Sequence, residues 1–335
     1  MHNRRGTIQA FPIESQILRG NLPGDPHVRD LHVYLPPGYE GGNERYPVVW
    51  MLAGFTGRGR QLLNDGPWAP ALNERMDALI ASGKCPPMIL ALPDCFTHLG
   101  GSQYVNSVGQ GRYEDYLIEE LVPAVDARFR TLPDPSHRGV MGRSSGGYGA
   151  ITLGMKHPET FGAIACHSGD MFFEFIYARE FGPAIRRIRK AGGVAAWYQK
   201  FHAALRMRND DHAPLDVLAM AACYSPNPKV PPAYADLPFD LETGAARPEV
   251  MARWRQHDPL HMVERYAENL RRCRLLFVDC GSDDDFYLEL GSRQLSAKLN
   301  ALGVRHEYEE FEDGHMGISY RFDVSLPKMA AALAP

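Results

Sequence analysis

The chain has 335 residues, of which 44% are hydrophobic and 23% are charged, a composition typical of a globular protein with a large core. Its net charge of −4 excludes a strongly basic surface for nucleic acid, and no stretch approaches the roughly 20 apolar residues of a membrane span. Arg4 and Arg5 are not followed by the apolar run of about 7–15 residues that a signal peptide needs. We therefore expect a cytoplasmic protein without nucleic-acid or membrane partners.

Short apolar runs bounded by glycine and proline predict the strands of a sheet. In chain order these runs are 8–18, 28–35, 47–53, 88–92, 140–141, 161–166, 275–280 and 304–311. Helices are predicted between them at 68–82, 113–129, 148–157 and 287–302. Because strands and helices alternate, the sequence predicts an α/β fold with a mostly parallel central sheet and helices on both of its faces.

Residues 170–272 interrupt this alternation. They contain helical segments at 181–190 and 194–205 and a proline-rich stretch at 225–238. We interpret them as a cap-like insertion in a single domain that spans residues 1–335. The insertion begins just after a predicted strand, at the edge of the sheet where open α/β folds bind ligands. Its dense aromatic start, which includes Phe172 and Phe173, is a candidate substrate pocket, although these rings could equally pack the insertion onto the body.

The six cysteines include no C-x-x-C pair and no zinc spacing, while counting alone does not decide whether they form disulfides. Cys166 and Cys280 lie inside apolar runs, and we interpret them as reduced, buried small hydrophobic residues. The acidic run at 283–285 lacks the spacing of an EF-hand calcium loop. The sequence therefore predicts no metal and no cofactor.

Residues 142–146, Gly-Arg-Ser-Ser-Gly, fit the pattern Gly-x-Ser-x-Gly between a predicted strand and a predicted helix. A strand, a sharp turn and a helix are what a nucleophile elbow requires, and glycines beside the serine leave room for the strained turn. The alternatives are an ordinary glycine-rich turn or a phosphate-binding loop, but the latter lacks its lysine and its glycine spacing. We predict Ser144 as the nucleophile.

A serine nucleophile needs a neutral imidazole as base and a carboxylate that orients the imidazole. In doubly wound hydrolases the acid and the histidine follow the serine in chain order. His315 lies between glycines after the last predicted strand, whereas His157, His257 and His261 lie at a helix end or within the insertion. The acid comes from Asp283-Asp284-Asp285, and position alone leaves the choice among the three open.

An oxyanion hole needs backbone N–H groups directed at the developing negative charge. Ser145, directly after the nucleophile, is expected to supply one of them. The loop after the first buried strand, Gly54-Phe55-Thr56-Gly57, is expected to supply the other. The alternative is that this loop is a glycine-rich connector without a chemical role.

Taken together, the sequence resembles the α/β-hydrolase esterases that include esterase D (S-formylglutathione hydrolase), feruloyl esterases, enterochelin esterase-like proteins and the antigen 85 acyltransferases. The resemblance covers nearly the whole chain except the insertion. It rests on residues 33–39 (VYLPPGY), 46–48 (YPV), 52–55 (LAGF), 100–106 (GGSQYVN), 142–150 (GRSSGGYGA), 157–161 (HPETF), 281–284 (GSDD) and 314–315 (GH). These motifs are specific for the fold and the chemistry and poorly specific for the substrate.

The resemblance implies Ser144 as nucleophile, Asp284 as acid and His315 as base, with Phe55 and Ser145 as oxyanion donors. The expected substrate-binding residues are Gly54, Thr56, Tyr104, Asn106, Phe172 and Phe173. One departure is Ala53-Gly54 where the family usually has His-Gly, so the supporting hydrogen bonds of the hole must differ. The long insertion is a second departure, and it weakens any transfer of a substrate.

The expected function is a serine carboxylesterase for small or medium acyl esters, with a small-molecule ester as its partner. A thioesterase of the S-formylglutathione type is the second hypothesis. A feruloyl or acetyl-polysaccharide esterase is the third, because no signal peptide indicates a substrate outside the cell. An acyltransferase, a catalytically silent binding protein on the same fold, and a homodimeric assembly are left open by the sequence.

Overall fold

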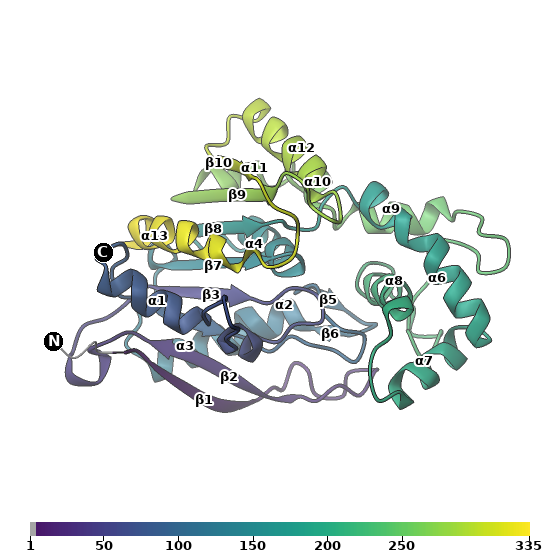
Figure 1. Ribbon diagram of the computed structural model, residues 1–335, viewed down its shortest axis with the longest axis horizontal. Coiled ribbons are helices and arrows are strands. Elements are labelled where there is room, and N and C mark those ends of the chain that lie inside the picture. Colours follow the sequence, from purple (N-terminus) through teal and green to yellow (C-terminus); the bar gives the residue numbers. More distant parts are fainter. Residues whose placement is uncertain (1–4) are drawn as a thin grey trace.

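The computed structural model describes residues 5–335, so Arg4 and the residues before it lie outside it. Its centre is an eight-stranded sheet in the order β1-β2-β4-β3-β7-β8-β9-β10 (Figure 1). The strands are β1 (Thr7–Glu14), β2 (Val28–Leu35), β3 (Val48–Leu52), β4 (Ile89–Leu92), β7 (Arg138–Arg143), β8 (Ala163–His167), β9 (Leu275–Gly281) and β10 (Glu307–Phe311). A separate short ribbon pairs β5 (Asn106–Ser107) with β6 (Gly111–Arg112).

The sheet is antiparallel at one side and parallel elsewhere. β2 pairs antiparallel with both β1 and β4, whereas the neighbours from β4 to β10 all run parallel. Parallel strands end at the same edge of the sheet, so the loops after β3, β7, β8 and β9 gather there. The mostly parallel sheet predicted from the sequence is therefore present.

Strand alternation sends neighbouring side chains into two cores. In β3, Val48, Trp50 and Leu52 face a core that also holds the inner sides of the helices α3 (Val122–Arg128), α4 (Ser145–Lys156) and α12 (Leu288–Ala301). Val49 and Met51 face the other core, formed with α1 (Leu72–Ala81) and α13 (Phe322–Leu333). The helices predicted on both faces of the sheet are therefore present, and they bury this strand from both sides.

Several helix boundaries differ from the predicted ones. The helix expected at 68–82 begins at Leu72, where the side chain of Glu74 accepts a hydrogen bond from the Ala71 N–H, and Trp68 is 95% exposed. Pro70 explains the late start, because the residue before a proline is disfavoured in a helix. The segment 113–129 is α2 (Tyr113–Asp115), a π-helical stretch (Tyr116–Leu121) and α3. Helix α13 was not predicted from the sequence.

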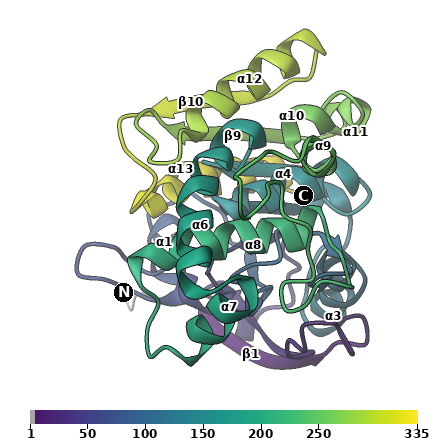
Figure 2. The same ribbon diagram turned by 90° about the vertical axis from the view of Figure 1, so that its right-hand side faces the viewer.

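The regular elements of the insertion are helices, with a long non-helical stretch between Tyr224 and Pro248. The insertion contains α5 (Phe173–Ile176), α6 (Ala178–Ala191), α7 (Val194–Ala203), α8 (His212–Tyr224), α9 (Pro248–Arg255), α10 (Pro259–Met262) and α11 (Ala267–Arg271). Helices α6 to α9 lie beyond one end of the sheet, at the right of Figure 1 and facing the viewer in Figure 2. By contrast, α10 and α11 contribute Leu260 and Leu270 to the core on the α4 side of the sheet. The cap-like part is therefore shorter than 170–272.

Helix α8 is the centre of the cap-like part. All of its 13 residues except His212 are buried, and it packs beside α6 (Figure 2). Burial on every side removes the polar face that would have given α8 a helical pattern in the sequence, which explains why it was not predicted. All six cysteines are buried as free thiols. Among residues 5–335, no helix is both long enough and apolar enough to cross a bilayer.

Helix α13 gives a direct test of how the sheet is covered. Leu326 is fully buried in the core between α13 and the sheet, so Leu326→Ala should destabilise the protein by about 2–5 kcal/mol through lost burial and a cavity. The matched control is Val324→Ala on the same helix, where the side chain is only half-buried and the loss should be clearly smaller. Urea unfolding of both variants measures the difference, and equal midpoints would contradict this packing.

Candidate active site

Ser144 lies at the turn between β7 and α4. Its backbone angles, φ 58° and ψ −128°, fall in a region that residues other than glycine rarely occupy. The turn is possible because its neighbours lack side chains: a Cβ at Gly146 would collide with the carbonyl of Leu52, and a Cβ at Gly142 would collide with the backbone of Gly146. The predicted strand, sharp turn and helix are therefore present, with α4 in direct contact with β3.

The structure brings His315 and Asp284 to Ser144. Nε2 of His315 lies 3.0 Å from Oγ of Ser144, and Nδ1 of His315 lies 2.8 Å from Oδ2 of Asp284. His315 and Asp284 are each only 3% exposed, whereas Ser144 is partly open to solvent. The hydroxyl, the imidazole and the carboxylate thus form one continuous chain of hydrogen bonds that ends at an accessible oxygen.

The three consecutive aspartates have different contacts. Oδ1 of Asp284 accepts a hydrogen bond from the N–H of Phe286 at 2.9 Å, which fixes the carboxylate that faces His315. Oδ2 of Asp285 accepts from the main-chain N–H of His315 at 3.0 Å and so holds the loop rather than the ring. Asp283 contributes its main-chain N–H to the carbonyl of Asp313 at 3.1 Å. Only Asp284 contacts the imidazole.

The charge of Asp284 follows from its surroundings. Burial raises the pKa of Asp284, but the hydrogen bond and the charge of His315, together with main-chain N–H groups, outweigh burial and leave the pKa lowered. The carboxylate is therefore ionised near neutral pH. An ionised carboxylate at Nδ1 favours the tautomer that leaves Nε2 free to accept the serine proton.

The expected oxyanion donors flank the nucleophile. Phe55 and Ser145 both line the pocket at Ser144, and within residues 5–335 neither main-chain N–H has a hydrogen-bond acceptor. Gly54 lies so close that a Cβ there would be 3.3 Å from Cβ of Ser144. Thr56 has a left-handed φ of 61° and lines a different hollow, on the other side of the loop.

Tyr104 and Asn106 do not line the pocket at Ser144. Tyr104 is 5% exposed, and its hydroxyl donates a hydrogen bond to the carbonyl of Ala53 at 2.7 Å. It therefore supports the loop after β3 and does not contribute to the pocket lining. The side chain of Asn106 is exposed and hydrogen-bonds Asp115 at 2.7 Å. The Tyr104 hydroxyl thus fixes the main chain at Ala53, directly before the loop that carries Phe55.

Phe172 and Phe173 also lie away from the pocket lining. Phe173 is fully buried with its ring centroid 5.0 Å from that of Tyr224, and Phe172 stacks on Phe175 at 5.3 Å. The main-chain N–H groups of both Phe172 and Phe173 donate to the carboxylate of Asp258. These aromatic rings pack the insertion together, which was the alternative that the sequence left open.

A pocket of about 50 Å³ opens beside Ser144, between the body and the insertion. The body provides Phe55, Ser145, Phe286 and Leu288 next to the nucleophile. The insertion provides Asp170, Ile176, Tyr177, Glu180, His212 and Asp216. Ile176 and Tyr177 belong to the aromatic and apolar start of the insertion that was predicted as a candidate pocket, whereas Asp170, Glu180, His212 and Asp216 were not predicted as site residues.

Asp170 is the most highly connected of these residues. Its Oδ2 accepts hydrogen bonds from Oγ of Ser145 at 3.0 Å, from Nε2 of Gln103 at 3.0 Å and from the hydroxyl of Tyr177 at 3.2 Å. Burial raises the pKa of Asp170, although these donors and the charge of His315 act in the opposite direction. Its place three residues after β8, at the carboxyl edge of the sheet, is a signal that could have identified it.

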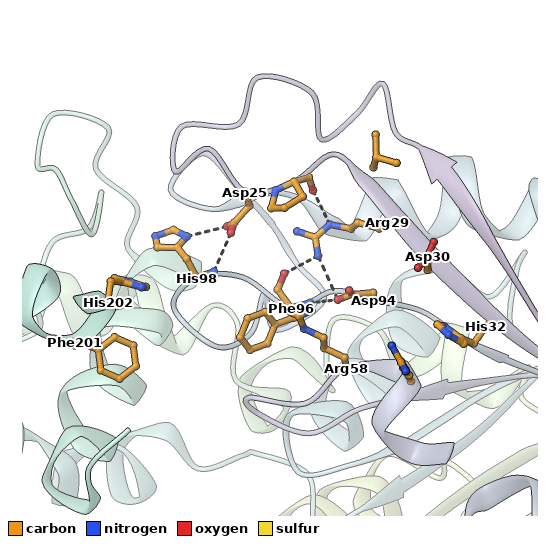
Figure 3. A pocket seen from close by; sticks show the side chains of 13 residues that line it. Asp25, Arg29, Asp30, His32, Arg58, Asp94, Phe96, His98, Phe201 and His202 are labelled. Carbon is orange, nitrogen blue, oxygen red and sulfur yellow. Dashed lines mark hydrogen bonds and ion pairs between the residues drawn. The ribbon is translucent and has the colours of Figure 1, made fainter. Parts of the chain in front are cut away.

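A larger pocket of about 610 Å³ lies elsewhere, between the start of β2, the loop after β4 and α7 (Figure 3). Two of its carboxylates have close partners: Asp25 lies 2.9 Å from Nδ1 of His98, and Asp94 lies 3.3 Å from Nη1 of Arg29. Neither Ser144 nor the side chains bonded to it line this pocket. The smaller pocket is therefore the candidate active site.

Residues 26–333, which include the whole of this site, match the protein family described as "Putative esterase". The chain belongs to this esterase family. Its relatives include the endo-1,4-beta-xylanase/feruloyl esterase of Xylanibacter ruminicola, 32% identical over 152 residues that cover 43% of this chain and 20% of that protein. Esterase Rv1288 of Mycobacterium tuberculosis is 26% identical over 309 residues, 91% of this chain and 56% of that protein. The chain thus spans only part of the length of these relatives.

Solved structures of esterases share the fold. A ferulic acid esterase is similar with a TM-score of 0.64 at 20% sequence identity, over 98% of this chain and 99% of that one. An S-formylglutathione hydrolase from Agrobacterium tumefaciens is similar with a TM-score of 0.60 at 20% identity, over 98% of this chain and 96% of that one. The predicted α/β-hydrolase fold and the predicted esterase family are therefore confirmed.

The three aspartates of the acid loop can be compared by separate replacement with asparagine. Asp284→Asn should lower kcat/KM for an activated ester by about 10⁴-fold, because it removes the carboxylate that orients the imidazole. Asp285→Asn should cost about tenfold, since it weakens one hydrogen bond to the main chain of His315. Asp283→Asn should stay near wild type. An equal or larger loss at Asp283 or Asp285 would refute the assignment of Asp284.

Proposed function

We propose that this protein is a serine carboxylic ester hydrolase that acts on small or medium acyl esters. The observation that carries the proposal is the chain of hydrogen bonds from Ser144 Oγ to His315 Nε2 at 3.0 Å and from His315 Nδ1 to Asp284 Oδ2 at 2.8 Å. This chain begins at a strained elbow in a protein of an esterase family. The three residues have the geometry that nucleophilic catalysis by serine requires.

In the acylation step, Nε2 of His315 takes the proton of Ser144 as Oγ attacks the carbonyl carbon of the ester. Asp284, held at Nδ1, stabilises the imidazolium that forms. The alkoxide of the tetrahedral intermediate is stabilised by the main-chain N–H groups of Phe55 and Ser145. The intermediate collapses when the C–O bond to the alcohol breaks and His315 returns the proton to the leaving oxygen.

In the deacylation step, water replaces the alcohol. His315 takes a proton from this water, the resulting hydroxide attacks the acyl carbon, and Ser144 leaves with the proton that His315 returns. The cap-like part of the insertion supplies one wall of the pocket within the single domain of residues 1–335, through side chains such as Glu180, His212 and Asp216. The small volume of this pocket supports a substrate with a small group beside Ser144.

A thioester is the second candidate substrate. An S-formylglutathione hydrolase shares the fold over nearly the whole chain, and the same acylation step would cleave a C–S bond. A feruloyl ester is a further candidate. One relative by sequence is named as a feruloyl esterase, and one similar solved structure is that of a ferulic acid esterase. A panel of acetyl, butyryl and feruloyl esters with the matching acetyl thioester separates these substrate classes.

Replacement of the nucleophile tests the proposal. Ser144→Ala should reduce hydrolysis of phenyl acetate by about 10⁴–10⁶-fold, because without Oγ no acyl-enzyme forms. Thermal unfolding and circular dichroism should show an intact fold. The matched control is Ser136→Ala, which changes an exposed hydroxyl that bonds only to Asp134. Retention of more than about a tenth of wild-type turnover by Ser144→Ala would refute the mechanism.

A further inference from the structure

Asp216 is a buried carboxylate without a partner. Asp216 lies on α8 and is only 8% exposed. It lines the pocket at Ser144. Among residues 5–335, no hydrogen-bond donor and no cation is paired with its carboxylate, whose oxygens face the pocket. Leaving a buried polar group unpaired costs free energy, so a carboxylate in this position calls for an explanation.

Other buried carboxylates of the insertion show the contrast. Asp258 accepts hydrogen bonds from the main-chain N–H groups of Phe172, Phe173 and Leu260. Asp211, the residue directly before α8, forms an ion pair with Arg187 and accepts a hydrogen bond from the indole N–H of Trp197. Asp216 lacks any such donor, so packing of the insertion does not account for it.

The surroundings of Asp216 define a chemical environment. Asp170 and Glu180 line the same pocket, and Arg179 is the cation nearest to Glu180, with an Nε to Oε1 distance of 3.4 Å. The lining includes no lysine and no arginine, and His212 is its only basic side chain. Burial and the neighbouring charges of Asp170 and Glu180 raise the pKa of Asp216 well above its ordinary value.

Aromatic rings complete the pocket. Phe55, Tyr177 and Phe286 line it together with the carboxyl groups. Aromatic faces and carboxylates both attract cations, and each attraction is stronger where water is excluded. A pocket of about 50 Å³ favours a compact head group such as a primary ammonium.

We propose that this pocket is a subsite for a primary alkylammonium group, with Asp216 as the counter-ion and aromatic rings around it. As the ammonium group enters, the Asp216 carboxyl releases its proton to solvent and forms an ion pair with the bound cation. If the proposed esterase function holds, the preferred substrates are esters that carry an amino group near the scissile bond. The binding of the cation itself does not require catalysis.

Binding is measured by calorimetry on Ser144→Ala, so that the result does not depend on turnover. The probes are n-propylammonium, 1-propanol as the neutral isostere and propionate as the anion. We expect n-propylammonium to bind at least about tenfold more tightly than 1-propanol, a difference of about 1.4 kcal/mol. In Ser144→Ala/Asp216→Asn this preference should fall below about threefold, whereas Asp210→Asn, which removes an exposed charge nearby, should keep it.

Equal binding of n-propylammonium and 1-propanol, or tighter binding of propionate, would overturn the proposal. So would an ammonium preference that survives Asp216→Asn. Thermal stability adds an independent readout: removal of an unpaired buried carboxylate should leave the melting temperature unchanged or raise it, whereas a structural Asp216 would show a clear drop. If ammonium binds but no ester is hydrolysed by the wild-type protein, the proposed function fails and the subsite stands.

Discussion

The contact between the start of α4 and the end of β3 is the constraint on which the site depends. Gly146 packs against the carbonyl of Leu52 so closely that no side chain fits between them. This contact places the strained Ser144 at the edge of the sheet and sets the Ser145 N–H beside the loop that carries Phe55. A larger residue at Gly146 would move the proposed nucleophile and a proposed oxyanion donor together, so both depend on the same packing requirement.

A second buried network holds the neighbouring strands. His167, at the end of β8, lies 2.6 Å from Asp279 through Nδ1 and 2.9 Å from Oγ of Ser325 through Nε2. These residue types repeat those of the candidate active site, but Ser325 is fully buried and no substrate could reach it. The network instead ties α13 to β8 and β9, and the carbonyl of His167 accepts the N–H of Ser144 at 2.9 Å. Access therefore distinguishes the candidate catalytic serine from the structural one.

The sequence could predict the features that depend on local spacing. The strand–turn–helix around Ser144 and the placement of His315 after the last strand follow from short motifs, and the family resemblance singled out Asp284. Features that depend on tertiary packing could not be predicted in the same way. Phe173 looked like pocket lining yet packs against Tyr224, and α8 lacks a polar face because the insertion surrounds it. Asp216, a single carboxylate in the apolar run of α8, was a readable signal that the motifs did not include.

The central claim is that Ser144 alone among the serines is an activated, accessible nucleophile. The most direct measurement is labelling of the wild-type protein with a fluorophosphonate, followed by peptide mass spectrometry. The account predicts one adduct, on the peptide that contains Ser144, and its loss in Ser144→Ala. It also predicts strongly slowed labelling in His315→Ala, because the imidazole activates the hydroxyl. An adduct on another serine such as Ser325, or no adduct on the folded wild-type protein, would contradict the account.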